Sequence, residues 1–253
     1  MMIRNIRVAL AILMGAAVLA LLSMPVAAES TDVRIQVRAV DAKFIGSGVG
    51  GMNVVVENAQ TGALLASGKI TGTTGDTEAL MKQGQIRGHA PATPDSASFT
   101  ASIDIDRPVL ARIRVAGPLD GAHSIRQLSV TQWLLPGQDL VDPGVVLQLP
   151  GLIVAPIEVA VTDDQLRIGV DVSMLCGCPI TRGGLWDSED FSVNASLYRE
   201  GEKVQTFPLQ FTGKTNRFAA KVAVPETGSY ELWILAHESN ADNTGAWHQR
   251  LEF

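Results

Sequence analysis

The stretch "QLRIGVDVSM", from Gln165 to Met174, decides the fold class. Apolar side chains occupy every second position of it: Leu166, Ile168, Val170, Val172 and Met174. A repeat of two places these side chains on one face of an extended strand, whereas a helix would need a repeat near 3.6. The stretch therefore predicts a β-strand with one face in a hydrophobic core.

Six further runs of the same kind share residues 152–253 with this strand. They are "VAPIEVAV" before it and "FSVNASLYRE", "KVQTFPLQF", "RFAAKVAV", "SYELWILAH" and "AWHQRLEF" after it. Seven short strands separated by turn residues are typical of a β-sandwich. The sequence therefore predicts a β-sandwich in the second part of the chain.

Residues 31–150 contain a separate series of alternating runs. They are "VRIQVRAV", "MNVVVENAQTGALLASGKITG", "FTASIDID", "VLARIRVAG" and "IRQLSVTQWLL". Helical spacing is confined to "TEALMKQ", from Thr77 to Gln83, where Thr77 is placed to cap a short helix. We therefore predict a second β-sandwich with at most one helical turn.

The boundary between the two series falls in "LPGLIVAP", residues 149–156. Two prolines and a glycine interrupt this segment, and such punctuation is common between domains. We predict an all-β protein of two consecutive β-sandwich domains, 29–151 and 152–253.

Two segments resemble known β families. "PETGSYELWI", residues 225–234, resembles the approach to the penultimate strand of immunoglobulin-like domains, with Gly228 and Tyr230 placed as in a tyrosine corner. The resemblance implies that the Tyr230 phenol bonds to nearby backbone. Leu232 stands where antibody domains carry a cysteine, so their disulfide between sheets is not expected. "NVVVENAQTGALLASGKITGTTGD", residues 53–76, resembles transthyretin-like and carboxypeptidase-regulatory-like modules.

The first 28 residues are typical of a secretory signal peptide. Arg4 and Arg7 precede an uncharged apolar run over residues 8–22, and Val26 and Ala28 fit a small-residue cleavage site. We expect a mature chain that begins at Glu29 and is periplasmic or secreted; the alternative is an uncleaved anchor. No later segment approaches the roughly 18 uncharged residues that a membrane helix needs, so we expect no stable membrane insertion after cleavage.

The charge excludes some classes of partner. The chain carries 20 basic and 26 acidic side chains. Removal of Arg4 and Arg7 leaves 18 against 26, a formal charge of −8 for the mature chain. The charges are scattered, and no basic stripe is present in the sequence. We therefore expect no binding to nucleic acid or to anionic membranes.

The two cysteines, Cys176 and Cys178, are separated by one glycine. They follow the strand that ends at Met174, in the loop between the second and third strands of the predicted immunoglobulin-like sandwich. In such a sandwich this loop lies at the same end as the loop between strands six and seven. That second loop runs from His237 to His248, so two thiols, a thioether and two imidazoles could converge.

Three chemistries compete for this cluster. An oxidising compartment favours a Cys176–Cys178 disulfide, although so small a loop restrains the unfolded chain little. Both sulfurs, with Met174, His237 or His248, could instead hold a soft metal ion, for which Cu(I) is the best match and zinc a poorer one. Thiol–disulfide exchange is the third, but redox pairs usually have two intervening residues at a helix N-terminus.

No acid, base and nucleophile set is recognisable in the sequence, so we predict a non-catalytic protein. The predicted function is a secreted or periplasmic binding or accessory protein whose Cys-Gly-Cys loop is its main functional feature and whose partner is another exported protein or a soft metal ion. The alternatives are a periplasmic Cu(I)-handling protein and a thiol–disulfide oxidoreductase. "MLCGCPI" followed by "GGLWD" also resembles a group of exported bacterial proteins of unassigned function.

Overall fold

A computed structural model describes residues 28–83, 87, 92–162, 165–223 and 226–253. The signal-peptide prediction lies almost wholly outside these residues. The strands are β1 (Glu29–Ala39), β2 (Met52–Asn58), β3 (Leu64–Ile70), β4 (Phe99–Ile105), β5 (Val109–Gly117), β6 (Arg126–Leu134), β7 (Leu140–Leu149), β8 (Leu152–Thr162), β9 (Gln165–Met174), β10 (Phe191–Arg199), β11 (Glu202–Phe211), β12 (Arg217–Ala223), β13 (Ser229–Glu238) and β14 (Asn243–Glu252). The short helices are η1 (Ser47–Val49), η2 (Glu78–Lys82), η3 (Ala122–Ser124) and η4 (Ser188–Asp190).

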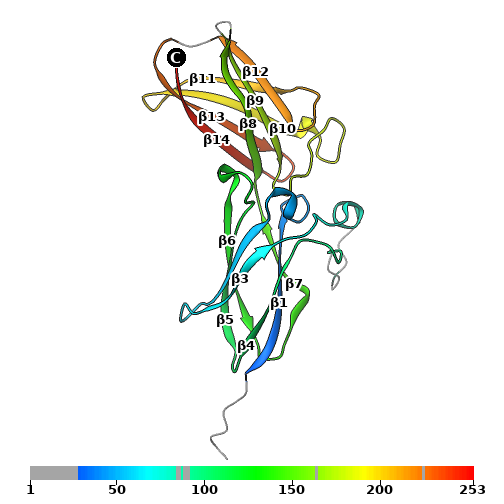
Figure 1. Ribbon diagram of the computed structural model, residues 1–253. Helices are drawn as coiled ribbons and strands as arrows, with labels where there is room; N and C mark the ends of the chain where they lie inside the picture. Colours follow the sequence, from blue (N-terminus) through cyan, green and yellow to red (C-terminus); the bar gives the residue numbers. More distant parts are fainter. Residues whose placement is uncertain (1–27, 84–86, 88–91, 163–164, 224–225) are drawn as a thin grey trace, which may run out of the picture.

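The N-terminal half, residues 29–151, packs two sheets face to face (Figure 1). One sheet has the order β4-β1-β7, with β7 parallel to β1; the other has the order β3-β2-β5-β6 and is antiparallel. Alternate residues of the central strands fill the space between the sheets: Val33, Ile35 and Val37 from β1, Val54 and Val56 from β2, Ile113 and Val115 from β5. This is the layered arrangement that a repeat of two requires.

The C-terminal half, residues 152–253, is one sheet of order β14-β13-β10-β11-β12-β9-β8. The sheet folds over on itself, and its two edge strands come together: a Cβ on Gly245 of β14 would lie 2.7 Å from the Leu152 carbonyl oxygen of β8. The alternating side chains of β9 are buried as predicted, from Leu166 to Met174. The predictions of an all-β chain and of seven strands after residue 151 are confirmed.

The tyrosine corner is present. The Tyr230 hydroxyl donates to the Glu226 carbonyl oxygen at 3.0 Å, and the tyrosine ring is buried. This bond anchors the chain where it enters β13, which is the role that the resemblance to immunoglobulin-like domains implied.

One strand was missed by sequence reasoning. β7 contains Pro143 and Gly144, which read as a turn, yet it pairs with β1 along most of its length. The register shifts between Val33 and Ile35, whose partners are Leu140 and Val145. This irregularity accommodates the proline, which lacks an N–H for the ladder, and β7 is an edge strand, where proline is tolerated.

The helical turn near Thr77 is present, and Thr77 is at its N-cap position, but the capping hydrogen bond is accepted by Asp76. η2 follows Thr77, whose side chain makes no capping hydrogen bond and accepts instead from the Lys43 ammonium at 2.9 Å. Asp76 accepts from the Ala79 N–H at 2.8 Å. The carboxylate one residue earlier therefore satisfies the free amide. Within the described residues, no helix is long and apolar enough to cross a membrane.

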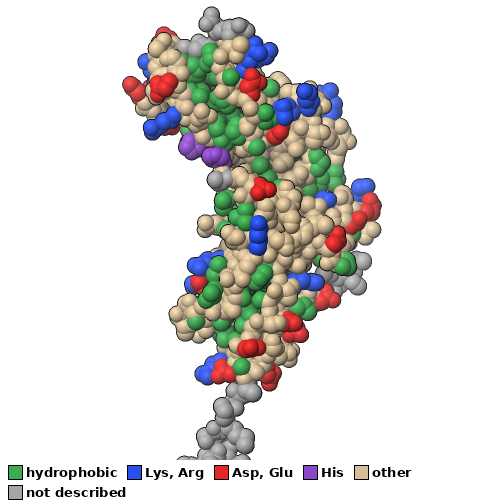
Figure 2. Space-filling model, viewed as in Figure 1, with side chains coloured by type: hydrophobic (Ala, Val, Ile, Leu, Met, Phe, Trp, Pro, Cys, Tyr) green, Lys and Arg blue, Asp and Glu red, His purple; other side chains and the backbone are tan. Residues whose placement is uncertain are grey.

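The two halves lie end to end, and a hollow marks the waist between them (Figure 2). Their buried residues nevertheless form one continuous hydrophobic cluster. The segment that joins them is short, because β7 ends at Leu149 and β8 begins at Leu152.

Candidate functional site

The Cys-Gly-Cys loop leaves β9 directly at this junction. Cys176 and Cys178 form a disulfide, and each is only 3% exposed. Two backbone bonds close the loop: Gly177 N donates to the Met174 carbonyl oxygen at 2.8 Å, and Met174 N donates to that of Cys178. Both sulfur atoms therefore belong to the interior rather than to the surface.

The loop contacts the N-terminal half. Gly177 has φ +76°, and a Cβ on it would lie 2.7 Å from Cγ1 of Val49 in η1. Farther along the same loop, the Trp186 indole N–H donates to the Asp41 carbonyl oxygen at 2.9 Å. A glycine is needed at position 177 both for the left-handed backbone and for this close approach.

Asn243 connects three segments at the same junction. Its side-chain oxygen accepts from Gly151 N at 2.9 Å, and its side-chain nitrogen donates to the Val40 carbonyl oxygen at 3.1 Å and to the Glu238 carboxylate at 3.2 Å. Both Asn243 and Glu238 are buried. The β13–β14 loop is thereby fixed to the linker and to the end of β1.

The charge at the junction affects Asp41. Burial raises the pKa of its carboxyl, the carboxylate of Glu238 and more weakly that of Asp190 raise it further, and Arg38 lowers it. Burial likewise lowers the pKa of Arg38, against the raising effect of Asp41. Asp41 therefore carries its charge at a cost to the folded state.

The β9–β10 and β13–β14 loops meet at Asp190. Its carbonyl oxygen accepts from Ser239 N at 3.0 Å, and its carboxylate accepts from the Asn240 side chain at 2.9 Å. The histidines nevertheless point away from the sulfurs, because both lie on the outer face of the sheet. His237 faces Asp242 at 3.2 Å, and the His248 ring stacks on Trp233 with centroids 4.4 Å apart.

The structure thus does not bring Cys176, Cys178, Met174, His237 and His248 together. Met174 and the disulfide are in the interior, while the two imidazoles are on the outside. Among the described residues, no group of three or more His, Cys, Asp or Glu side chains is arranged to hold a metal ion. The copper site stays a prediction without an assembled ligand set.

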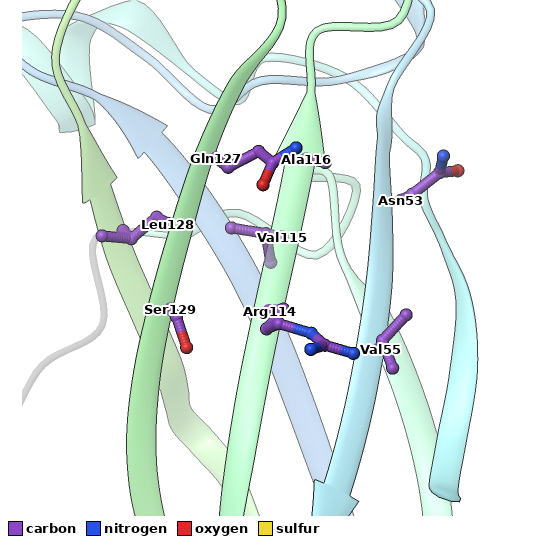
Figure 3. Close-up of a pocket in the computed structure, with 8 residues that line it drawn as sticks. All are labelled: Asn53, Val55, Arg114, Val115, Ala116, Gln127, Leu128 and Ser129. Carbon is purple, nitrogen blue, oxygen red and sulfur yellow. The ribbon is translucent and has the colours of Figure 1, made fainter.

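A second candidate site lies on the N-terminal half, on what we call the outer sheet face. It consists of the outward side chains of β2, β5 and β6: Asn53, Val55, Glu57, Leu110, Arg112, Arg114, Ala116, Gln127, Ser129, Thr131 and Trp133. A hollow of about 350 Å³ crosses all three strands on this face (Figure 3). In the close-up, the Arg114 side chain extends from β5 across to Val55 on β2. The lining of the hollow thus combines polar side chains, such as Arg114 and Gln127, with apolar ones, such as Val55.

The arginines of this face are held in place by one carboxylate. Glu57 accepts from Arg112 at 3.1 Å through one oxygen and from Arg114 at 2.9 Å through the other. The Glu57 side chain is only 13% exposed, whereas those of Arg112 and Arg114 are 41% and 52% exposed. The guanidinium groups are thus oriented by the sheet while remaining open to a ligand.

Trp133 lies at one end of the outer sheet face. It pairs with Leu110 in the β5–β6 ladder and is 52% exposed. Its neighbour Leu134 is fully buried, which fixes the outward direction of the indole. Sequence reasoning missed this face; the signal was the outward half of "VLARIRVAG" and "IRQLSVTQWLL", where arginine, glutamine, serine, threonine and tryptophan alternate with core residues.

The chain was compared with known proteins. No protein-family model matches it, and no curated protein sequence matches it. Solved structures with a related arrangement include a candidate carbohydrate-binding protein from Bacteroides uniformis, with 10% identity, TM-score 0.28, and 88% of this chain and 100% of that chain covered.

Two other similar structures are the chicken interferon gamma receptor alpha chain (11% identity, TM-score 0.31, 90% and 98% covered) and the fimbrial anchor protein Mfa2 from Porphyromonas gingivalis (10% identity, TM-score 0.23, 89% and 82% covered). At these TM-scores the likenesses carry no argument about what this chain binds.

Proposed function

We propose that this chain is a non-catalytic exported binding protein that holds an extended ligand on the outer sheet face. The observation that carries the proposal is the 350 Å³ hollow of Figure 3, whose described lining combines amide, hydroxyl and guanidinium groups. The lining residues that the structure describes include no carboxylate, imidazole or thiol. The hollow therefore offers hydrogen-bonding groups to a ligand, and the nearest carboxylate of the face, Glu57, is engaged by Arg112 and Arg114.

The C-terminal half is proposed to act as a support. The disulfide-braced loop contacts Val49, and Trp186 and Asn243 bond to the end of the N-terminal half, so the ligand-bearing sheet is held at a fixed position. We also propose the division into domains 29–151 and 152–253, because each sheet draws its strands from one side of Gly151.

Export is supported by the signal-like residues 1–28 and by the disulfide, which persists in oxidising compartments. Copper handling and thiol exchange both need an accessible reduced sulfur. The buried disulfide favours a bracing role for Cys176 and Cys178 instead.

The test is affinity electrophoresis of the purified protein through gels that contain a neutral β-glucan, polygalacturonate or poly-L-glutamate. We expect at least one polymer to retard the protein, and a Trp133→Ala/Arg114→Gln variant to lose that retardation. Trp233→Ala/Arg250→Gln, which makes the same changes on the outer face of the other half, should behave as wild type. Retardation by none of the three polymers, or unchanged retardation of the first variant, would overturn the proposal.

A further inference from the structure

We infer that the ligand of the outer sheet face is an acidic polysaccharide, a polymer of carboxylated sugars. The inference rests on the proposed function, because it concerns the same face, and it adds the chemical class of the ligand. Three features carry it: the charge of the sheet, the arrangement of its arginines, and the exposed indole at its end.

The charge of this sheet is opposite to that of the protein. The outward side of strands β2, β3, β5 and β6, which the structure describes in full, carries three basic residues and one acidic residue: Lys69, Arg112, Arg114 and Glu57. The whole chain has 26 acidic against 20 basic side chains. A polyanion is therefore attracted to this sheet and repelled by much of the remaining surface.

The arginines match a carboxylate in particular. Glu57 fixes Arg112 and Arg114 side by side on β5, and both side chains stay about half exposed. A guanidinium is planar and binds a carboxylate through two parallel N–H···O bonds. Because Glu57 already orients both groups, a ligand carboxylate would cost little additional side-chain entropy.

Trp133 and the polar side chains between it and the hollow suit a sugar chain. The indole offers a flat apolar surface, against which a pyranose ring can stack, and an N–H at its edge. Thr131, Ser129 and Gln127 follow on the same side of β6 and can bond to hydroxyl groups. Six residues of strand separate Gln127 from Trp133, about 20 Å, which is long enough for several sugar units.

An acidic peptide fits this face less well. Peptides that bind to sheets usually add a strand to a free edge. The described residues of the hollow lie on β2, β5 and β6; β2 and β5 are paired on both sides, and β6 is an edge strand. Over β2 and β5, the second of which carries Arg112 and Arg114, the face therefore offers side chains rather than free backbone groups, and strand addition at the β6 edge would leave these arginines without a role.

The experiment compares polygalacturonate with its methyl ester, which keeps the sugar backbone and removes the charge. Poly-L-glutamate supplies the same carboxylates on a peptide chain. Binding to the purified protein is measured by calorimetry for each polymer. We expect polygalacturonate to bind, and the ester and poly-L-glutamate to bind at least about tenfold more weakly, the change typical of one lost charge-assisted contact.

The variants Arg114→Gln and Trp133→Ala should each weaken polygalacturonate binding by about tenfold. Glu57 keeps Arg112 as its partner in the first variant, so the sheet should remain folded. Arg250→Gln removes one positive charge from an exposed side chain of the other half, and Trp233→Ala removes an indole there; both should bind as wild type.

Each other outcome has a distinct meaning. Equal binding of the methyl ester would overturn the inference about charge and leave the proposed function standing. Equal binding of poly-L-glutamate would overturn the inference that the ligand is a polysaccharide, while the proposal that the outer sheet face binds a ligand would stand. Equal loss in Arg250→Gln and Arg114→Gln would mean that only total charge matters, which overturns the inference. Binding of none of these three polymers would overturn the inference, and the proposed function would fall with it only if the neutral β-glucan also failed to retard the protein.

Discussion

The surroundings of Asp41 at the junction disfavour its ionised carboxylate. Its pKa is raised by burial and by the carboxylates of Glu238 and Asp190. The folded state therefore holds the proton more tightly than the unfolded chain, and stability is lost as pH rises through the folded pKa. We expect Asp41→Asn to unfold at a higher temperature than wild type at pH 7. The difference should vanish below about pH 3, where aspartate is protonated in both states.

Asp95 is the control for Asp41, because its pKa is shifted in the opposite direction. Hydrogen bonds from Thr93 and Thr73 lower the pKa of its carboxyl. Its contribution to stability is therefore present above the unfolded pKa and lost as pH falls through the folded one. Asp95→Asn should lower the melting temperature at neutral pH. A lower melting temperature for Asp41→Asn than for wild type at pH 7 would contradict the claim that the junction disfavours the ionised Asp41 carboxylate.

The contribution of the tyrosine corner to stability can be measured at Tyr230, where the chain enters β13. Tyr230→Phe removes the donor to the Glu226 carbonyl oxygen and should lower the free energy of unfolding by about 1 kcal/mol in urea titrations. Tyr198→Phe is the matched control, because no hydrogen bond joins the Tyr198 hydroxyl to any described residue. Equal losses in the two variants would show that the corner bond contributes nothing.

The cysteines define a third test at the residue scale. Because both sulfurs are paired and buried, denatured protein without reductant should show no free thiol, and purified protein should contain no copper. In native protein a reductant should act much more slowly than in urea, since access limits exchange. Two free thiols, or one copper ion per chain, would restore the metal hypothesis.

At the scale of elements, the Cys-Gly-Cys loop supports the junction through Gly177. Gly177→Ala places a methyl group against Val49 and also strains a left-handed backbone, a strain of about 1–2 kcal/mol. Gly201→Ala has the same strain at φ +83° but meets nothing within 4 Å. We expect Gly177→Ala to lose clearly more stability in urea titrations than Gly201→Ala.

A second change isolates the contact. In Val49→Ala/Gly177→Ala the clash is removed, so the double variant should be less destabilised than the two single changes add up to. Simple additivity would mean that the loop does not press on η1.

The elements differ in how far sequence could predict them. The strands with a clean repeat of two, such as β9, were predicted well because their apolar side chains alternate and all enter the core. β7 was missed because Pro143 and Gly144 hide its pattern, and only its pairing with β1 makes the segment a strand. Thr77 is the N-cap residue of η2, but sequence could not show that its hydroxyl accepts from Lys43, 34 residues away, while Asp76 accepts from the free amide of Ala79.

The candidate sites could not be predicted in full either, because they depend on contacts between segments that are distant in the sequence. Sequence placed Cys176 and Cys178 in a loop after β9, but the contact of that loop with Val49 joins segments more than 100 residues apart. Likewise, the outer sheet face exists only because β2 pairs with β5 and β5 with β6. Neither pairing could be derived from local patterns, which fix the face of a side chain but not its neighbours across the sheet.

At the scale of the whole molecule, we propose that one half binds the ligand and the other holds the binding half in position. The continuous hydrophobic cluster and the bonds of Asn243 and Trp186 join the halves end to end (Figure 1). The waist hollow, lined by Arg126, Asn194 and His237, begins at the first residue of β6 but shares no lining residue with the hollow of Figure 3, so the two can be distinguished in one experiment.

That experiment is a chemical-shift map of ¹⁵N-labelled protein titrated with a short oligogalacturonate. We expect the shifted signals to be the amides of Asn53, Arg114 and Gln127 and the indole N–H of Trp133, with the signals of the Cys-Gly-Cys loop unchanged. If the shifted signals cluster at the waist hollow or at residues 175–178, and those of the outer sheet face do not shift, the proposal that this face binds the ligand is contradicted.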